Sequence, residues 1–131
     1  MEIKNIMTRN IVKVKDTDTL KNALDVMTSD VVNSAPVVNG KDELVGIVVK
    51  ADIYRFLIED GHYDTYPVEA VMTKKVITVD SNTDVVEVGR VLRNNDIFAV
   101  PIVEENKILG LVSVEDLLDY FLKNADYLTQ K

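Results

Sequence analysis

Gly110-Leu111-Val112-Ser113-Val114-Glu115-Asp116 repeats the pattern of Gly46-Ile47-Val48-Val49-Lys50-Ala51-Asp52, which lies 64 residues earlier. Both stretches open with aliphatic and β-branched residues, which favour a strand. Both end on an aspartate, and a carboxylate is favourable in the first turn of a helix. The pattern therefore predicts a strand that leads directly into a helix, and it predicts this twice.

The similarity extends upstream at an offset of 65 residues. The clearest matches are Met7-Thr8 with Met72-Thr73 and Pro36 with Pro101. The offset changes in two polar stretches, residues 39–43 and 104–107, which read as turns. Surface turns tolerate single insertions. The chain therefore carries two copies of one unit.

Each copy predicts the same order of elements, β-α-β-β-α, in the α/β (α+β) class. The predicted strands are Ile11–Val14, Ala35–Val38 and Leu44–Val49 in the first copy, and Val76–Val79, Val100–Val103 and Ile108–Ser113 in the second. The polar runs 16–18 and 80–83 are helix-start signals. We expect repeat 1 over residues 3–58, a linker over 59–67, repeat 2 over 68–123 and a C-terminal tail over 124–131, with a pseudo-twofold axis relating the repeats.

Composition excludes several classes of function. Lys and Arg number 15 against 22 Asp and Glu, and a net charge of −7 disfavours a nucleic-acid partner. The chain has no cysteine, so disulfides, thiolate metal sites and a cysteine nucleophile are excluded. No apolar run reaches the roughly 18–20 residues of a membrane span, and no signal segment follows Met1. We expect a cytoplasmic protein without a membrane partner.

The paired motifs resemble the cystathionine-β-synthase (CBS) domain family over roughly residues 3–123. The resemblance is carried by the two Met-Thr pairs, the two proline-centred strands and the two Gly-to-Asp segments quoted above. It implies a stand-alone tandem CBS pair of the Bateman type, with two clefts between the repeats. It also implies that the clefts bind adenosine compounds such as AMP, ADP, ATP, S-adenosylmethionine or NAD, and that the pair regulates a fused or separate protein.

The first implied cleft depends on Asp116 and Ser113. A carboxylate can accept hydrogen bonds from both ribose hydroxyls, and such charge-assisted bonds are strong. The Ser113 hydroxyl can bond the ribose or a phosphate, and a helix N-terminus offers free N–H groups to an anion. The resemblance adds residues from the lead-in, which is the segment that carries the Met-Thr pair, and from the stretch before the proline: Thr8, Asn10, Ile11, Val12, Asn33, Ser34 and Ala35.

The second implied cleft depends on Asp52, and we rank it lower. Val49 stands where the family pattern has Ser or Thr, so the hydroxyl is lost. The resemblance assigns the remaining contacts to Thr73, Lys75, Val76, Ile77, Phe98, Ala99 and Val100. No basic residue directly precedes either proline. A ligand without phosphates, such as S-adenosylmethionine, therefore stays a candidate beside the nucleotides.

Simpler explanations exist for the same residues. Ser113-x-x-Asp116 is close to a capping box, and Asp52 would favour a helix start without any ligand. Both acids would then contribute similarly to stability. Thr8 and Thr73 also suit turns. The single histidine, His62, reads as a solvated linker residue, because one imidazole makes neither a metal site nor a triad.

Two functions compete with ligand sensing. The chain has no glycine-rich phosphate loop and no nucleophile elbow, so we expect no enzyme, no catalytic residue, no metal and no required cofactor. The alternative is a ligand-free module for dimerisation or protein interaction. Its basis is the apolar ends of the final helices, Phe56-Leu57-Ile58 and Phe121-Leu122. Such faces favour a homodimer, since monomers rarely leave large apolar patches exposed.

Overall fold

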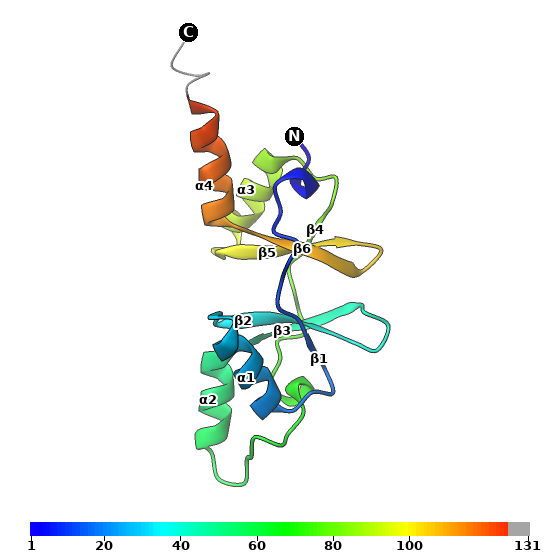
Figure 1. Ribbon diagram of the computed structural model, residues 1–131, viewed down its shortest axis with the longest axis vertical. Helices are drawn as coiled ribbons and strands as arrows, with labels where there is room; N and C mark the ends of the chain where they lie inside the picture. The colour runs from blue at the N-terminus through cyan, green and yellow to red at the C-terminus, as the bar shows by residue number, and fades with distance from the viewer. Residues whose placement is uncertain (126–131) are drawn as a thin grey trace. The chain divides into compact units, whose positions relative to one another are not determined.

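The computed structural model describes residues 1–125. Contacts divide the chain into two compact units (Figure 1). Unit 1 combines Met1–Ile11 with the chain from Ile77 onward, and unit 2 is Val12–Val76. The boundaries of the units therefore differ from the boundaries of the sequence repeats, because the first residues of each repeat belong to the unit that contains most of the other repeat.

Both units contain the predicted order of elements. Unit 2 holds β1 (Val14–Lys15), α1 (Leu20–Ser29), β2 (Ser34–Val38), β3 (Leu44–Val49), α2 (Lys50–Ile58) and the 3₁₀ turn η2 (Val68–Ala70). Unit 1 holds the 3₁₀ turn η1 (Ile3–Asn5), β4 (Val79–Asp80), α3 (Val85–Asn94), β5 (Ala99–Glu104), β6 (Lys107–Ser113) and α4 (Val114–Lys123). The α/β class and the β-α-β-β-α order predicted from sequence are confirmed.

Each unit has a three-stranded sheet, in the order β1-β2-β3 or β4-β5-β6. In both sheets the first pair of strands is parallel and the second pair antiparallel. Figure 1 shows both helices of each unit on one face of its sheet. The core forms there: the largest buried side chains include Leu20 and Met27 in unit 2 and Leu92 and Ile102 in unit 1.

The first strand of each sheet is shorter than predicted. Only Val14 and Lys15 pair with β2, and the corresponding strand of unit 1 is also two residues long. Residues 11–13 and 76–78 therefore lie outside the strands. This explains how Pro36 occupies the central strand: it lies beyond the end of β1, beside a register shift between Val37 and Val38. A proline within a sheet is usually found at such an edge or next to such an irregularity.

The first helix of each unit begins after its predicted start signal. In α1 the N-cap is Thr19, whose Oγ1 accepts a hydrogen bond from the Asn22 N–H at 3.1 Å. Asp18 instead accepts from the Lys15 N–H at 2.9 Å, and so closes the turn before the helix. In α3 the N-cap is Asp84, whose Oδ2 accepts from the Val86 N–H. That bond, together with the N-terminal ammonium, lowers the pKa of Asp84 below its usual range.

Both α1 and α3 end in a left-handed residue, Val31 with φ 57° and Asp96 with φ 53°. In α1 the Val32 N–H then bonds the Met27 carbonyl at 2.9 Å, as in a Schellman motif, and α3 repeats this bond. Aspartate adopts this conformation at little cost, whereas a β-branched residue such as Val31 is strained in it. Because Val31 is 89% exposed, packing does not offset its strain.

The linker after α2 is anchored by an aromatic cluster. The His62 ring stacks on Phe56, with centroids 3.8 Å apart and planes at 7°. Its Nδ1 lies 2.8 Å from the Phe56 carbonyl oxygen, and the Tyr66 ring contacts both rings edge-on. The expectation of a solvated histidine is wrong, because the neighbouring aromatic rings offer it a packing surface. The described part of the chain contains no helix long and apolar enough to cross a membrane.

The Met-Thr segments close the outer edges of the sheets. Thr8 forms two backbone hydrogen bonds with Leu111 of β6, at 2.8 and 3.0 Å, and Thr73 does the same with Ile47 of β3, at 2.8 and 2.9 Å. An unpaired strand edge would be open to pairing with another chain. Met7 and Thr8 therefore complete the sheet of unit 1, and the second Met-Thr pair completes the sheet of unit 2.

Glycines make this close approach feasible. A Cβ on Gly110 would lie 2.5 Å from the Thr8 carbonyl oxygen and 3.0 Å from the Met7 sulfur. A Cβ on Gly46 would lie 2.8 Å from Met72 Sδ and 2.9 Å from the Thr73 oxygen. In contrast, a Cβ on Gly89 in α3 would lie 3.8 Å from Leu117 Cδ1, which is ordinary contact. Of these three glycines, only the two in strands leave no room for a Cβ.

We predict opposite effects of two Gly→Ala changes on the free energy of unfolding. Gly110→Ala should lower it by about 1–3 kcal/mol, because the methyl group overlaps a backbone carbonyl. Gly89→Ala should raise it by about 0.5–1 kcal/mol, because alanine favours the helix interior and has room there. Urea unfolding measures both changes. Equal destabilisation by the two variants would contradict the requirement for glycine at the contact between Gly110 and the Thr8 backbone.

Candidate ligand-binding site

The start of α4 is a capping box in unit 1. The Ser113 Oγ accepts a hydrogen bond from the Asp116 N–H at 3.0 Å, and Oδ2 of Asp116 accepts from the Ser113 N–H at 2.8 Å. The capping box, which is the simpler explanation of Ser113 and Asp116, is therefore present. These bonds also fix the carboxylate in one orientation at the helix N-terminus.

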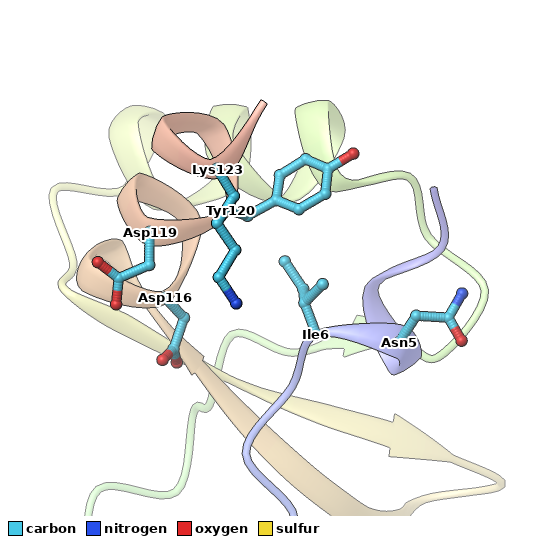
Figure 2. A pocket seen from close by; sticks show the side chains of 6 residues that line it. All are labelled: Asn5, Ile6, Asp116, Asp119, Tyr120 and Lys123. Carbon is cyan, nitrogen blue, oxygen red and sulfur yellow. The ribbon is translucent and has the colours of Figure 1, made fainter. Parts of the chain in front are cut away.

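One oxygen of that carboxylate is available to a ligand. Within residues 1–125, Oδ1 of Asp116 has no hydrogen-bond or ion-pair partner. Asp116 also lines a pocket of about 260 Å³, which lies wholly in unit 1. The pocket is lined by Asn5, Ile6, Asp116, Asp119, Tyr120 and Lys123 (Figure 2). The capping role and a ligand-binding role are thus compatible in the same side chain.

The corresponding acid of unit 2 has different surroundings. Val49 is the N-cap of α2 and makes no side-chain cap bond. The Asp52 carboxylate instead pairs with the Arg55 guanidinium one turn along the helix. The two aspartates therefore differ in the way that the loss of the hydroxyl at Val49 suggests. Asp52 already has a cationic partner, and Asp116 has none among the described residues.

The residues assigned to the first cleft divide between the units. Thr8, Asn10, Ile11, Ser113 and Asp116 belong to unit 1, and Val12, Asn33, Ser34 and Ala35 belong to unit 2. In unit 1 Thr8 pairs with Leu111 of β6, and Leu111 comes two residues before Ser113. In unit 2 Ala35 is only 1% exposed, so its side chain serves the core.

The residues assigned to the second cleft divide in the same way. Asp52, Thr73, Lys75 and Val76 belong to unit 2, and Ile77, Phe98, Ala99 and Val100 belong to unit 1. Ala99 pairs with Ser113 across the sheet, and the Val114 N–H bonds the Phe98 carbonyl at 2.8 Å. Phe98 is 81% exposed, whereas Val100 is fully buried in the core of unit 1. Unit 1 therefore gathers residues of both assignments around the start of α4.

Sequence reasoning missed five of the six residues that line the pocket and predicted only Asp116. Asp119, Tyr120 and Lys123 follow it at positions i+3, i+4 and i+7 of α4, which places all four on one helix face. That spacing is visible in the sequence. The sequence gives no such signal for the lead-in residue Ile6, which lies opposite this face (Figure 2).

Comparisons with known proteins give the family of the chain. The model of the CBS domain matches it twice, at residues 3–59 and 68–123. The chain therefore belongs to the CBS domain family, as the paired motifs suggested.

Individual relatives agree with this assignment. A homoserine O-acetyltransferase of Methanococcus vannielii is 27% identical over 116 residues, which cover 88% of this chain and 24% of that protein. An uncharacterized conserved protein from Pyrococcus horikoshii has a crystal structure that is 35% identical, with a TM-score of 0.76, over 92% of this chain and 91% of its own. The chain spans about a quarter of the length of the first curated relatives that it matches.

A further solved structure shares the fold. It is the CBS domain pair of protein MJ0100 in complex with 5′-methylthioadenosine and S-adenosyl-L-methionine. The TM-score is 0.78 at 24% identity, over 95% of this chain and 98% of that one. At this identity the likeness establishes the architecture alone.

We predict that Ser113 contributes to stability through the capping box. Ser113→Ala removes the acceptor of the Asp116 N–H and should cost about 1 kcal/mol of unfolding free energy. Ser113→Thr keeps a hydroxyl and is the matched control. Asp52→Ala breaks only a largely exposed ion pair and should cost less, so equal stability contributions of the two aspartates are no longer expected. Urea unfolding compares the variants, and equal losses for Ser113→Ala and Ser113→Thr would contradict the cap.

Proposed function

We propose that the chain is a regulatory module that senses an adenosine-containing ligand, with Asp116 as the main polar anchor. One observation carries the proposal: Asp116 is held by the backbone at a helix N-terminus, has a carboxylate oxygen without a protein partner among residues 1–125, and borders a pocket. A carboxylate so oriented can accept hydrogen bonds from two vicinal hydroxyls. Ribose offers such a pair.

The remaining residues keep the roles that the family resemblance implies. Ser113 assists Asp116, and Thr8 contributes from the lead-in that pairs with β6. Asn10 and Ile11, which belong to the same unit as Asp116, are proposed to complete this part of the first site. The second set, headed by Asp52, is proposed as the weaker site, because Arg55 already neutralises its carboxylate.

Membership of the family supports sensing rather than catalysis. We propose that the chain is not itself an enzyme and acts on a fused or separate protein in the cytoplasm. The curated relatives that carry enzyme names match this chain over about a quarter of their length. Their activities are therefore not transferred here. AMP, ADP, ATP, S-adenosylmethionine and NAD all contain the adenosine group that the proposal requires.

A second candidate function is a homodimeric interaction module. Its support is an apolar stripe on α4, where Leu118 is 54%, Phe121 45% and Leu122 61% exposed. Exposed apolar stripes of this kind are typical of association surfaces. The two candidates are compatible, because the pocket residues Asp116, Asp119 and Lys123 are not part of this stripe.

The ligand proposal predicts unequal effects of two matched changes. Asp116→Asn retains an oxygen that can accept the Ser113 N–H but removes the charge. It should weaken an adenosine ligand by roughly 10- to 150-fold, because a charged hydrogen-bond partner contributes about 1.5–3 kcal/mol. Asp52→Asn should have a smaller effect. Calorimetric titration with adenosine compounds measures this. Binding that is unchanged in both variants would leave the capping box as the only role of Asp116.

The dimer proposal predicts that one substitution on α4 dissociates the protein. Leu118→Glu places a charge within the apolar stripe, and the exposed position should leave the fold intact. Thr28→Glu, at an exposed position of α1, adds the same charge and should leave the dimer unchanged. Light scattering at micromolar concentration measures the mass of both variants. A wild-type protein that is monomeric under these conditions would exclude the dimer.

A further inference from the structure

The two units differ in what packs against the ends of their helices. In unit 2 the linker that follows α2 returns to the start of α1 (Figure 1), where the Leu20 N–H bonds the Tyr66 carbonyl at 2.9 Å. Within the same linker the His62 ring stacks on Phe56 of α2. The segment that follows the second helix of unit 2 therefore contacts both helices of that unit.

The corresponding place in unit 1 is a pocket of about 400 Å³. This α3–α4 pocket is lined by Met1, by residues 84–86 at the start of α3, and by Tyr120, Phe121 and Asn124 at the end of α4. All of these residues belong to unit 1. Tyr120 matches Phe56 at the repeat offset of 64 residues. The ring on which the linker packs in unit 2 thus has a counterpart that borders a pocket in unit 1.

Two polar side chains of the α3–α4 pocket already have partners. Asp84 accepts hydrogen bonds from the Val86 N–H at 3.0 Å and from the N-terminal ammonium at 3.3 Å. Asn124 Nδ2 donates to the Tyr120 carbonyl at 2.7 Å. The surface that remains is largely apolar, because Val86 and Phe121 are 46% and 45% exposed. An uncharged aromatic ring is therefore the kind of group that this pocket favours.

The chain that follows α4 carries such a ring at the matching place. Helix α2 ends at Ile58 and helix α4 ends at Lys123. His62 and Tyr127 each come four residues after the last residue of their helix. Tyr127 is three residues beyond Asn124, which lines the pocket, and three extended residues span about 10 Å. The segment after α4 is therefore long enough to bring an aromatic ring back to the pocket.

We infer that residues 126–131 pack into the α3–α4 pocket, with the Tyr127 ring against Tyr120, in the way that the linker packs on α2 in unit 2. Burial of the ring removes apolar surface from water and adds an aromatic pair, and both effects are favourable. Tyr120 also lines the pocket beside Asp116, so the packed segment borders the candidate ligand site. The inference goes beyond the proposed function and does not require a ligand.

Nuclear magnetic resonance spectroscopy of the full chain tests the inference. Nuclear Overhauser contacts should connect the Tyr127 ring with the side chains of Tyr120 and Val86. Tyr127→Ala should shift the methyl resonances of Val86, because the ring current of Tyr127 is lost. Tyr63→Ala removes a linker tyrosine that is 65% exposed and is the matched control. It should leave the Val86 resonances unchanged.

A sample that mixes isotope-labelled and unlabelled chains identifies the source of the ring. Contacts within one chain support the inference. Contacts between a labelled and an unlabelled chain would show that the segment of a second copy fills the pocket, and they would overturn it. The absence of any contact between Tyr127 and Tyr120 would overturn it as well. Because no ligand is added, the proposed function stands or falls independently of these outcomes.

Discussion

The close approach of a backbone segment to a glycine is the constraint on which both units depend. Thr8 and Leu111 can exchange two backbone hydrogen bonds only because Gly110 has no side chain at the place where the Thr8 carbonyl lies. The same contact occurs at Gly46. It closes the free edge of each three-stranded sheet, and it places a lead-in threonine beside the strand that ends in the candidate site. One steric requirement thus serves both the stability of the sheet and the position of the site.

The two copies use one scaffold for two electrostatic environments. The backbone course from strand to helix is the same at Val49 and at Ser113, yet the following aspartates differ in their partners. Asp116 is oriented by backbone groups, which leaves part of its charge available. Asp52 is neutralised by Arg55. Two differences in sequence, valine for serine at the cap and arginine for aspartate three residues after the acid, therefore separate a structural ion pair at Asp52 from a candidate anchor at Asp116.

The candidate site is built from groups that also stabilise the unit. The capping box satisfies backbone donors that a helix start otherwise leaves unpaired. The same box fixes the orientation of the Asp116 carboxylate, which borders the pocket. Because the cap and the proposed ligand contact share these atoms, a variant that alters the cap is expected to change both stability and binding.

The sequence by itself determined the repeat, the order of elements, the family and the two aspartates, because these follow from local patterns at a fixed offset. It placed the longer strands within one or two residues. It failed at the short strands and at His62, where pairing partners and aromatic neighbours decide the outcome. Only the tertiary structure decided which sheet each Met-Thr pair completes. The hydrogen bonds of Thr8 and Thr73 are backbone bonds, which leave no signal in the side chains. The sequence alone would therefore allow each Met-Thr pair to bond the sheet of either repeat. The packing at Gly110 and Gly46 selects the arrangement in which each pair bonds the sheet of the other repeat.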